Sequence, residues 1–278
     1  MIWLNGRLVT REQAHIDPAD RGLLLADGLF ETLRAYRGHV FKLEDHLQRL
    51  ADGAMELGIP LPLDPPSIAE AVRETLAANQ LSASDAALRI TLTRGPGQRG
   101  LLPPDDPLPT LIISAAAYHA PSNVDGFVAV TAKRARRNEK SITTRLKTLG
   151  YLDNVIAQSD AAAAGADEAI MLNNRDAVAC GGRSNVFAMM DGALTTPAIE
   201  EGALPGITRH AVLALCKGEG IEVREGAMTR AELQTAAEIF VTNSLLEVMP
   251  VRRFDEGHFA IGPITKRIAK AYSNLTPR

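Results

Sequence analysis

The spacing of apolar residues predicts strands and helices in the first third of the chain. Short strands over 2–4 and 7–10 flank Asn5-Gly6, a pair typical of the two-residue turn of a β-hairpin. Helical spacing over 42–57 predicts an amphipathic helix, whose buried face would be formed by Leu43, His46, Leu47 and Leu50. The other elements predicted here are a strand over 29–36, a helix over 67–78, and strands over 87–93 and 110–117.

A break in this pattern near residue 120 predicts a second domain. His119-Ala120-Pro121-Ser122 separates two β segments, as expected of a linker. We expect a small N-terminal α/β domain over 1–118, a linker over 119–123 and a large C-terminal α/β domain over 124–278. The elements predicted in the second domain are strands over 127–132 and 238–242, helices over 152–164 and 208–216, a final helix, and a hairpin-like stretch over 169–194 with turns at Asn173-Asn174 and Asp191-Gly192. Strands and helices mix without regular alternation, which favours an α+β fold.

Composition and charge narrow the kinds of partner. The 278 residues are 46% hydrophobic, and 30 basic residues against 33 acidic ones give a net charge of -3. This balance gives no reason to expect nucleic acid or an anionic membrane surface as a partner, so small molecules are the expected ligands. No signal peptide or membrane-spanning stretch is recognisable, which predicts a cytoplasmic protein. Cys180 and Cys216 lack the spacing of a disulfide framework or a metal site, so no metal is expected.

The glycine-rich stretch from Gly95 to Gly100 fits the spacing of a dinucleotide-binding loop. Such a loop opens a helix, whereas this one is followed by Leu101-Leu102-Pro103-Pro104, which cannot do so. A mobile loop that carries Arg99 fits better, because a guanidinium can bind a carboxylate through two hydrogen bonds.

Two other stretches have both an ordinary and a functional interpretation. Lys147 lies between a predicted strand and a predicted helix; it is either a solvated surface lysine or, in an apolar setting, an amine suited to imine chemistry. Gly206-Ile207-Thr208 begins a predicted helix. It is either an ordinary capped helix with Thr208 near the N-cap or an anion site at the helix N-terminus.

A series of motifs in a fixed order resembles the class IV aminotransferases, which include branched-chain aminotransferases, D-amino-acid aminotransferases and aminodeoxychorismate lyases. The resemblance covers nearly the whole chain. It rests on Asp20-Arg21-Gly22, Asp27-Gly28-Leu29-Phe30-Glu31-Thr32, His46-Leu47-Gln48-Arg49-Leu50, Leu146-Lys147, Ser184-Asn185-Val186-Phe187, Leu204-Pro205-Gly206-Ile207-Thr208-Arg209 and Thr242-Asn243-Ser244-Leu245.

The resemblance implies a pyridoxal 5′-phosphate enzyme of amino-acid metabolism with two α/β domains. The active site of that fold lies between the domains and is completed by a loop from a second subunit, so a homodimer is implied. Lys147 would form the imine with the cofactor and carry protons. The other implied contacts are Arg49, Ile207, Thr208, Asn243 and Ser244 at the phosphate, Leu204 at the pyridine ring, Phe30 in the substrate pocket, and Arg99 at the substrate carboxylate.

One position departs from the family pattern. Five residues before Asn185, where the family usually has a glutamate that keeps the pyridine nitrogen protonated, this chain has Cys180. A neutral thiol is a weaker partner for a pyridinium than a carboxylate is. We therefore expect a weaker electron sink, unless Cys180 ionises to a thiolate.

The expected activity is the transfer of an amino group between an amino acid or amine and a 2-keto acid. The nearest alternative is an aminodeoxychorismate lyase that releases 4-aminobenzoate and pyruvate, because Gly97-Gln98-Arg99-Gly100 and residues 243–251 resemble that branch most. A protein that binds pyridoxal phosphate without catalysis is the third alternative, and Cys180 is its only support. The sequence does not fix the amino donor or its stereochemistry.

Overall fold

The computed structural model describes residues 1–121 and 125–277, and contacts within the chain divide these residues into two compact units. The first unit comprises residues 1–119, 146–150 and Pro277. The second comprises the described residues of 120–145 together with 151–276. The division is therefore not a single cut in the sequence, because Leu146–Gly150 is grouped with the first unit rather than with the C-terminal residues around it. Residues 122 and 123 of the predicted linker lie outside the described residues.

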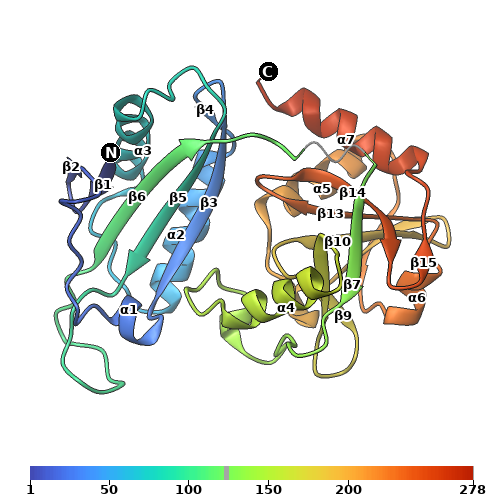
Figure 1. Cartoon of the computed structure of the whole chain (residues 1–278), viewed down its shortest axis with the longest axis horizontal. Helices are drawn as coiled ribbons and strands as arrows, with labels where there is room; N and C mark the ends of the chain where they lie inside the picture. The colour runs from blue at the N-terminus through green and yellow to red at the C-terminus, as the bar shows by residue number, and fades with distance from the viewer. Residues whose placement is uncertain (122–124, 278) are drawn as a thin grey trace. The chain divides into compact units, whose positions relative to one another are not determined.

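The first unit is built on a six-stranded antiparallel sheet in the order β2-β1-β6-β5-β3-β4. The predicted hairpin at the N-terminus is confirmed, with φ of 46° at Asn5 and 93° at Gly6, as a tight hairpin turn requires. Helices α2 and α3 lie along the sheet (Figure 1). The elements are β1 Ile2–Leu4, β2 Arg7–Val9, α1 Arg21–Leu25, β3 Gly28–Tyr36, β4 His39–Val40, α2 Leu43–Glu56, α3 Pro65–Ala78, β5 Ala86–Thr93 and β6 Thr110–Ala117.

The two faces of this sheet differ because side chains alternate along each strand. One face packs with the helices in a core that includes Leu29, Leu33, Leu88 and Ile90. The predicted buried face of α2 is confirmed, since Leu43, His46, Leu47 and Leu50 are all buried. The side chains between these core positions, Phe30 among them, lie on the other face of the sheet.

The second unit contains a nine-stranded mixed sheet in the order β12-β11-β10-β13-β14-β7-β8-β9, with β15 paired to β14. Both parallel pairs, such as β7 with β8, and antiparallel pairs, such as β10 with β13, occur in it, so the predicted α+β fold is confirmed. Its elements are β7 Phe127–Thr131, the 3-10 helix η1 Ile142–Thr144, α4 Leu152–Ala163, β8 Glu168–Leu172, β9 Val178–Gly181, β10 Asn185–Met190, β11 Ala193–Pro197, the 3-10 helix η2 Ile199–Glu201, α5 Ile207–Gly218, β12 Val223–Gly226, α6 Arg230–Gln234, β13 Glu238–Asn243, β14 Glu247–Phe254, β15 Gly257–His258 and α7 Pro263–Leu275.

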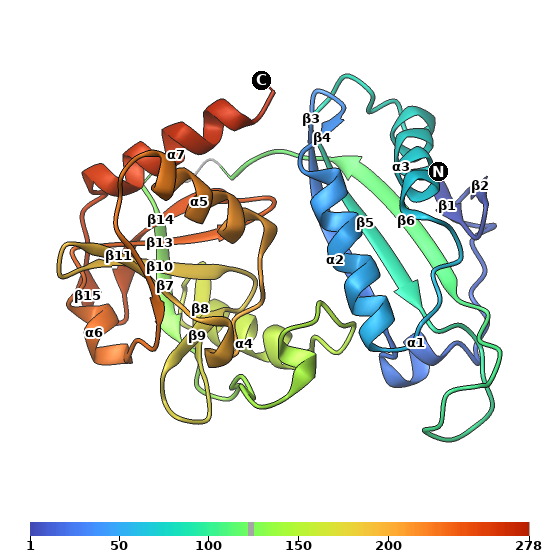
Figure 2. The ribbon, with the colours of Figure 1, turned by 180° about the vertical axis from the view of Figure 1, so that it is seen from behind.

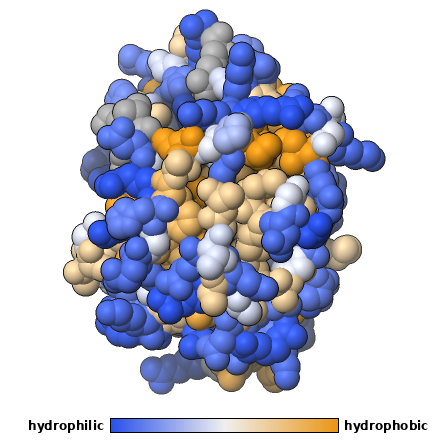
Figure 3. Space-filling view, turned by 90° about the vertical axis from the view of Figure 1, so that its right-hand side faces the viewer, coloured by the Kyte–Doolittle hydropathy of each residue, from blue (hydrophilic) through white to orange (hydrophobic). Residues whose placement is uncertain are grey.

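Helices cover the second sheet in two places. Helices α5 and α7 pack against each other and on β13, while α4 packs on β8 and β7 (Figure 2). On the face of the second unit seen in Figure 3, hydrophilic side chains surround a smaller apolar area. Within residues 1–121 and 125–277, no helix combines the length and the apolar character needed to cross a membrane.

Candidate active site

Lys147 lies on a short segment that is hydrogen-bonded to strand β3. The Phe30 N–H donates to the Lys147 carbonyl at 2.9 Å, and the Leu149 N–H donates to the Gly28 carbonyl at 2.9 Å. The side-chain Nζ lies 4.5 Å from the centre of the Phe30 ring, and the residue is half-buried. The Lys147 amine is therefore packed against an aromatic ring and is not fully exposed.

Beside Phe30 in the chain, Glu31 forms a buried cluster with two side chains of α2. His46 and Arg49 are three residues apart, so they lie on the same side of this helix. His46 Nδ1 lies 2.7 Å from Glu31 Oε2. Arg49 donates from Nε to Oε1 at 2.8 Å and from Nη2 to Oε2 at 2.7 Å.

The charge states in this cluster follow from burial and from the ion pair. Burial raises the pKa of Glu31, but the hydrogen bond from His46 and the charge and hydrogen bonds of Arg49 outweigh burial and hold that pKa at about 2. Burial lowers the pKa of His46, against the opposing effect of Glu31. The carboxylate is thus ionised at neutral pH, and the neutral imidazole donates from Nδ1.

Arg89 also contacts Phe30, on the sheet face that the helices do not cover. Its guanidinium carbon lies 3.9 Å from the centre of the Phe30 ring, and the residue is exposed on β5. Sequence reasoning missed it. The signal that could have found it is the alternation along β5, where Arg89 stands between the buried Leu88 and Ile90 and so points to the other face.

The loop that carries Arg99 is held by the buried Arg21. The Arg21 guanidinium donates to the carbonyls of Gly100, Leu101 and Leu102 at 3.1, 3.0 and 3.3 Å, and its Nε donates to Asp27 at 2.8 Å. Arg99 itself is exposed. No helix follows the glycines, which agrees with the rejection of a dinucleotide site.

In the second unit, the N-terminus of α5 has no side-chain cap. The helix begins at Ile207 with Gly206 as its N-cap, so Thr208 is its second residue and lies near the N-cap. A Cβ at position 206 would lie 2.2 Å from Asn185 Oδ1, which leaves room only for glycine. Asn185 in turn donates to the Leu204 carbonyl at 2.9 Å. The first backbone N–H groups of α5 and its dipole can therefore face an anion.

Polar side chains lie at the end of β13 and directly after it. Asn243 Oδ1 accepts from the N–H groups of Leu245 and Leu246 at 2.9 and 2.7 Å, so this amide shapes the turn. Ser244 is half-buried. The buried hydroxyl of Thr242 has no hydrogen-bond partner among the described residues, and a buried polar atom of this kind indicates a missing ligand or water.

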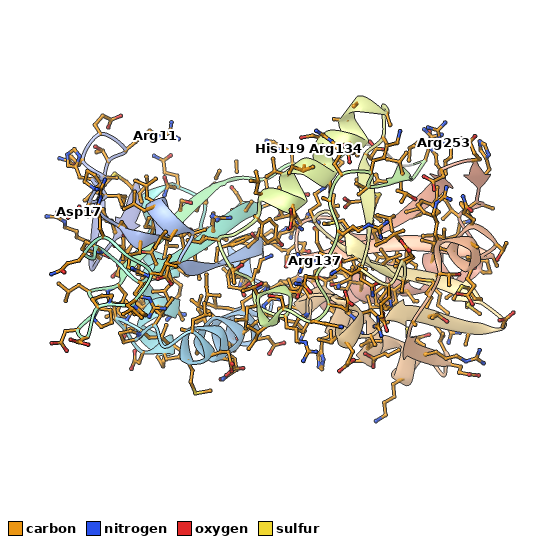
Figure 4. The ribbon with its side chains drawn as sticks, turned by 90° about the horizontal axis from the view of Figure 1, so that it is seen from below. Arg11, Asp17, His119, Arg134, Arg137 and Arg253 are labelled. Atoms are coloured by element: carbon orange, nitrogen blue, oxygen red, sulfur yellow. The ribbon has the colours of Figure 1, made fainter. Side chains whose placement is uncertain are left out.

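Cys180 is a buried thiol at the end of β9. Burial raises its pKa, and the charge of Glu168 raises it further. The charge of Arg137, a residue labelled in Figure 4, opposes both effects. At neutral pH the group is therefore a thiol, so the alternative of a thiolate is disfavoured.

Glu168, which sequence reasoning also missed, fixes the turn that follows Cys180. Its carboxylate accepts from the Gly182 N–H at 3.0 Å and from the Ser184 hydroxyl at 2.8 Å. It is buried at the first position of β8, and the sequence carries no local signal for this long-range contact.

The predicted site residues thus fall into two sets. Lys147, Phe30, Arg49 and Arg99 belong to the first unit, where Lys147 contacts Phe30. The second unit contains Cys180, Leu204, Ile207, Thr208, Asn243 and Ser244.

Comparisons with known proteins define the class first. The structure matches the crystal structure of Escherichia coli branched-chain amino acid aminotransferase with a TM-score of 0.93 and 32% identity, covering 99% of this chain and 93% of the other. It matches 4-amino-4-deoxychorismate lyase from Pseudomonas aeruginosa with a TM-score of 0.88 and 32% identity, over 99% and 98% of the two chains. A branched-chain-amino-acid aminotransferase of Salmonella typhimurium is 34% identical over 99% of this chain and 92% of its own length.

The family follows from these matches and from a family model. Residues 28–254 match the model described as amino-transferase class IV. The chain belongs to the class IV aminotransferases and is an enzyme of that class.

Proposed function

We propose that this protein transfers an amino group between an amino acid or amine and a 2-keto acid, with Lys147 as the residue that binds pyridoxal 5′-phosphate covalently. The observation that carries the proposal is the position of the half-buried Lys147 amine, 4.5 Å from the Phe30 ring centre. The family is dependent on pyridoxal phosphate, and a branched-chain aminotransferase of similar structure (TM-score 0.91, 28% identity) is complexed with a phosphopyridoxyl derivative of glutamate.

The residues present fit this cofactor. Pyridoxal phosphate needs an amine for its aldehyde and cationic or N–H donors for its phosphate. The first unit supplies Lys147 and Arg49. The second supplies the uncapped N-terminus of α5, and the orphaned Thr242 hydroxyl lies in the strand that leads to Ser244. We propose that Leu204 lies against the ring of the cofactor.

Each side chain then has a definite task. When bound, the cofactor supplies an electrophilic carbon and an aromatic ring that withdraws electrons. Lys147 Nζ takes the proton from the Cα of the amino donor. In the second half of the reaction, when the 2-keto acid is converted to an amino acid, Lys147 Nζ gives a proton to the Cα of that acceptor. Arg49, the backbone of Ile207 and Thr208, and Ser244 hold the phosphate. Asn243 supports them by shaping the turn.

The test of the proposal is a spectroscopic screen of single half-reactions. The purified protein, reconstituted with pyridoxal phosphate, is mixed separately with L-amino acids, D-amino acids and chiral amines. The visible absorbance of the bound cofactor should disappear with one of these classes and return on addition of a 2-keto acid. Unchanged absorbance with every donor would contradict the proposal and support binding without catalysis.

A second candidate function is the lyase reaction. It is favoured by the match to the Pseudomonas lyase structure. Both reactions begin with removal of the Cα proton, and they differ in the group that leaves next. Release of 4-aminobenzoate from aminodeoxychorismate, without a requirement for a keto acid, would identify a lyase.

Arg99 and Arg89 are proposed to bind the substrate carboxylate. Both guanidinium groups are exposed in the first unit, and Arg89 already stacks on Phe30. Arg99→Gln and Arg89→Gln should each raise KM for the keto acid by about 10-fold to 100-fold, because a hydrogen bond to a charged group is lost. Steady-state kinetics will measure this.

The control is Arg11→Gln, an exposed arginine near the N-terminal hairpin (Figure 4), which should leave KM unchanged. If both variants keep the wild-type KM, neither arginine binds the carboxylate.

We propose that the protein forms a homodimer through an apolar surface of the first unit, which we call the leucine patch. It consists of the exposed Leu23, Leu24, Leu25, Leu101 and Leu102. Arg21, the first residue of α1, donates to the carbonyls of Leu101 and Leu102, which holds this part of the loop beside the start of the helix. Such a patch marks an interaction site.

Replacing Leu101 and Leu102 together with serine should weaken the dimer. The polar side chains would lose the free energy of burying two leucines, roughly 1.5–3 kcal/mol each. Light scattering after size exclusion should detect a shift from dimer towards monomer mass. Met55→Ser removes an equally exposed apolar side chain from α2 and should not change the mass. A wild-type protein of monomer mass would contradict the dimer itself.

A further inference from the structure

The carboxylate of Glu31 lies between a strand and a helix of the first unit with almost no exposure to solvent, 1%. Its two oxygens accept hydrogen bonds from Arg49 and from His46 within 2.8 Å. An ion pair at such depth costs desolvation energy, and replacing it with apolar residues is often neutral or stabilising. Stability alone therefore gives a weak reason for a charged group here.

We propose that Glu31 is a positioning residue that fixes the guanidinium of Arg49 for the phosphate of the cofactor. The inference rests on the proposed function of Arg49 as a phosphate-binding residue. It adds a role for a residue that does not itself contact the phosphate.

The geometry of the ion pair supports this role. Glu31 engages Nε and Nη2 of Arg49 with its two oxygens. A planar guanidinium held at these two nitrogens has a fixed plane and a fixed outward edge. A phosphate bound by Arg49 would use other N–H groups of the same plane, so its position is set by Glu31.

The support behind Glu31 is rigid. It lies within β3, where its backbone pairs with Ile90 of β5 in an eight-residue antiparallel register. His46 holds the carboxylate from the side of α2 through Nδ1. Arg49, by contrast, has a long side chain with many accessible rotamers. Anchoring it to a sheet removes this freedom before the phosphate binds.

Two effects of Glu31 oppose each other. Its negative charge lowers the attraction of Arg49 for an anion, whereas its hydrogen bonds orient the guanidinium. We expect orientation to dominate, because the side-chain amide introduced by Glu31→Gln would place an NH₂ group against an N–H donor of Arg49 or His46. The guanidinium would then turn away from its present plane.

The experiment compares the affinity of pyridoxal 5′-phosphate with that of pyridoxal, by the absorbance change on binding. The Kd of pyridoxal divided by the Kd of pyridoxal 5′-phosphate reports the contribution of the phosphate to binding. Glu31→Gln should reduce this ratio about tenfold, the effect of losing one well-oriented charge-assisted hydrogen bond, with the affinity for pyridoxal unchanged. Glu238→Gln is the matched control, since Glu238 is another buried carboxylate, bonded to Thr265, and should keep the ratio.

Arg49→Gln separates this inference from the proposed function. If Arg49→Gln keeps the ratio, Arg49 does not bind the phosphate and the proposed function of that residue fails. If Arg49→Gln lowers the ratio but Glu31→Gln keeps or raises it, the inference about Glu31 is overturned. In the Arg49→Gln background, Glu31→Gln should have no further effect; an additional loss would mean that Glu31 acts by another route.

Glu31→Asp covers the case in which Glu31→Gln does not fold. Aspartate keeps the negative charge, but its side chain is one methylene shorter. Its carboxylate therefore cannot keep the two hydrogen bonds to Arg49 at the same time. The ratio should fall here as well, and an unchanged ratio would overturn the inference.

Discussion

Replacing Lys147 with alanine should abolish both the visible absorbance of the bound cofactor and the amino-transfer activity. The amine is the only group proposed to bond covalently with the aldehyde, and it also carries the Cα proton. Loss of a general acid–base alone reduces rates by about 10²–10⁴-fold, so a fall in kcat of more than about 10³-fold is expected. Absorbance after reconstitution and a coupled keto-acid assay measure the two effects.

The matched control is Lys140→Ala. Lys140 is an exposed lysine seven positions earlier in the chain, and its removal should change neither absorbance nor rate. A Lys147→Ala protein with the wild-type turnover would refute the assignment. A protein that lost the absorbance but kept its activity would mean that another residue carries the proton.

Replacing Cys180 with glutamate should accelerate the half-reaction by about tenfold or more. The proposal behind this is that Cys180 stands at the pyridine nitrogen. Burial raises the pKa of its thiol, so the nitrogen would face a neutral group and be protonated less. A carboxylate at this position would raise the pKa of the pyridine nitrogen. Each pKa unit corresponds to about 1.4 kcal/mol, which is a factor of ten in rate if it is fully expressed in the transition state. Stopped-flow absorbance in a single half-reaction measures it.

Two controls separate charge from size and from unrelated thiol effects. Cys180→Gln has nearly the volume of glutamate without its charge and should not accelerate the reaction. Cys216→Ser removes the other buried thiol, whose pKa burial raises to about 11, and should have no effect. Equal rates for Cys180→Glu and wild type would contradict the proposal that Cys180 stands at the pyridine nitrogen. The electrostatic neighbours are Arg137, which would stabilise the new carboxylate, and Glu168, which would oppose it.

Much of the fold could be predicted from the sequence because its signals are local. The turn Asn5-Gly6, the amphipathic α2 and the strands β3, β5 and β6 were all predicted within a few residues. Helix α1 was missed, since five residues carry no periodicity. Strand β14 was missed as well; it contains Pro250 and alternates poorly.

The candidate site was harder to predict because its contacts connect distant parts of the chain. Lys147 alone looks like a surface lysine, and only the order of surrounding motifs indicated its role. Glu31 stands in one of those motifs, yet its task depends on a contact with Arg49 that no local pattern reveals. Glu168 reaches Ser184 across the sheet. Which side chains face each other across a sheet is set by register, and the sequence pattern constrains register only in part.

The grouping of Leu146–Gly150 with the first unit has a consequence for how the protein could be divided. A fragment that ends at His119 would lack the backbone partners of Gly28 and Phe30, because these come from Leu149 and Lys147. A fragment that begins after the linker would carry Lys147 away from the strand that orients it. Each unit is compact, but residues 1–119 do not encode the complete first unit, because Leu146–Gly150 comes from within the sequence of the second.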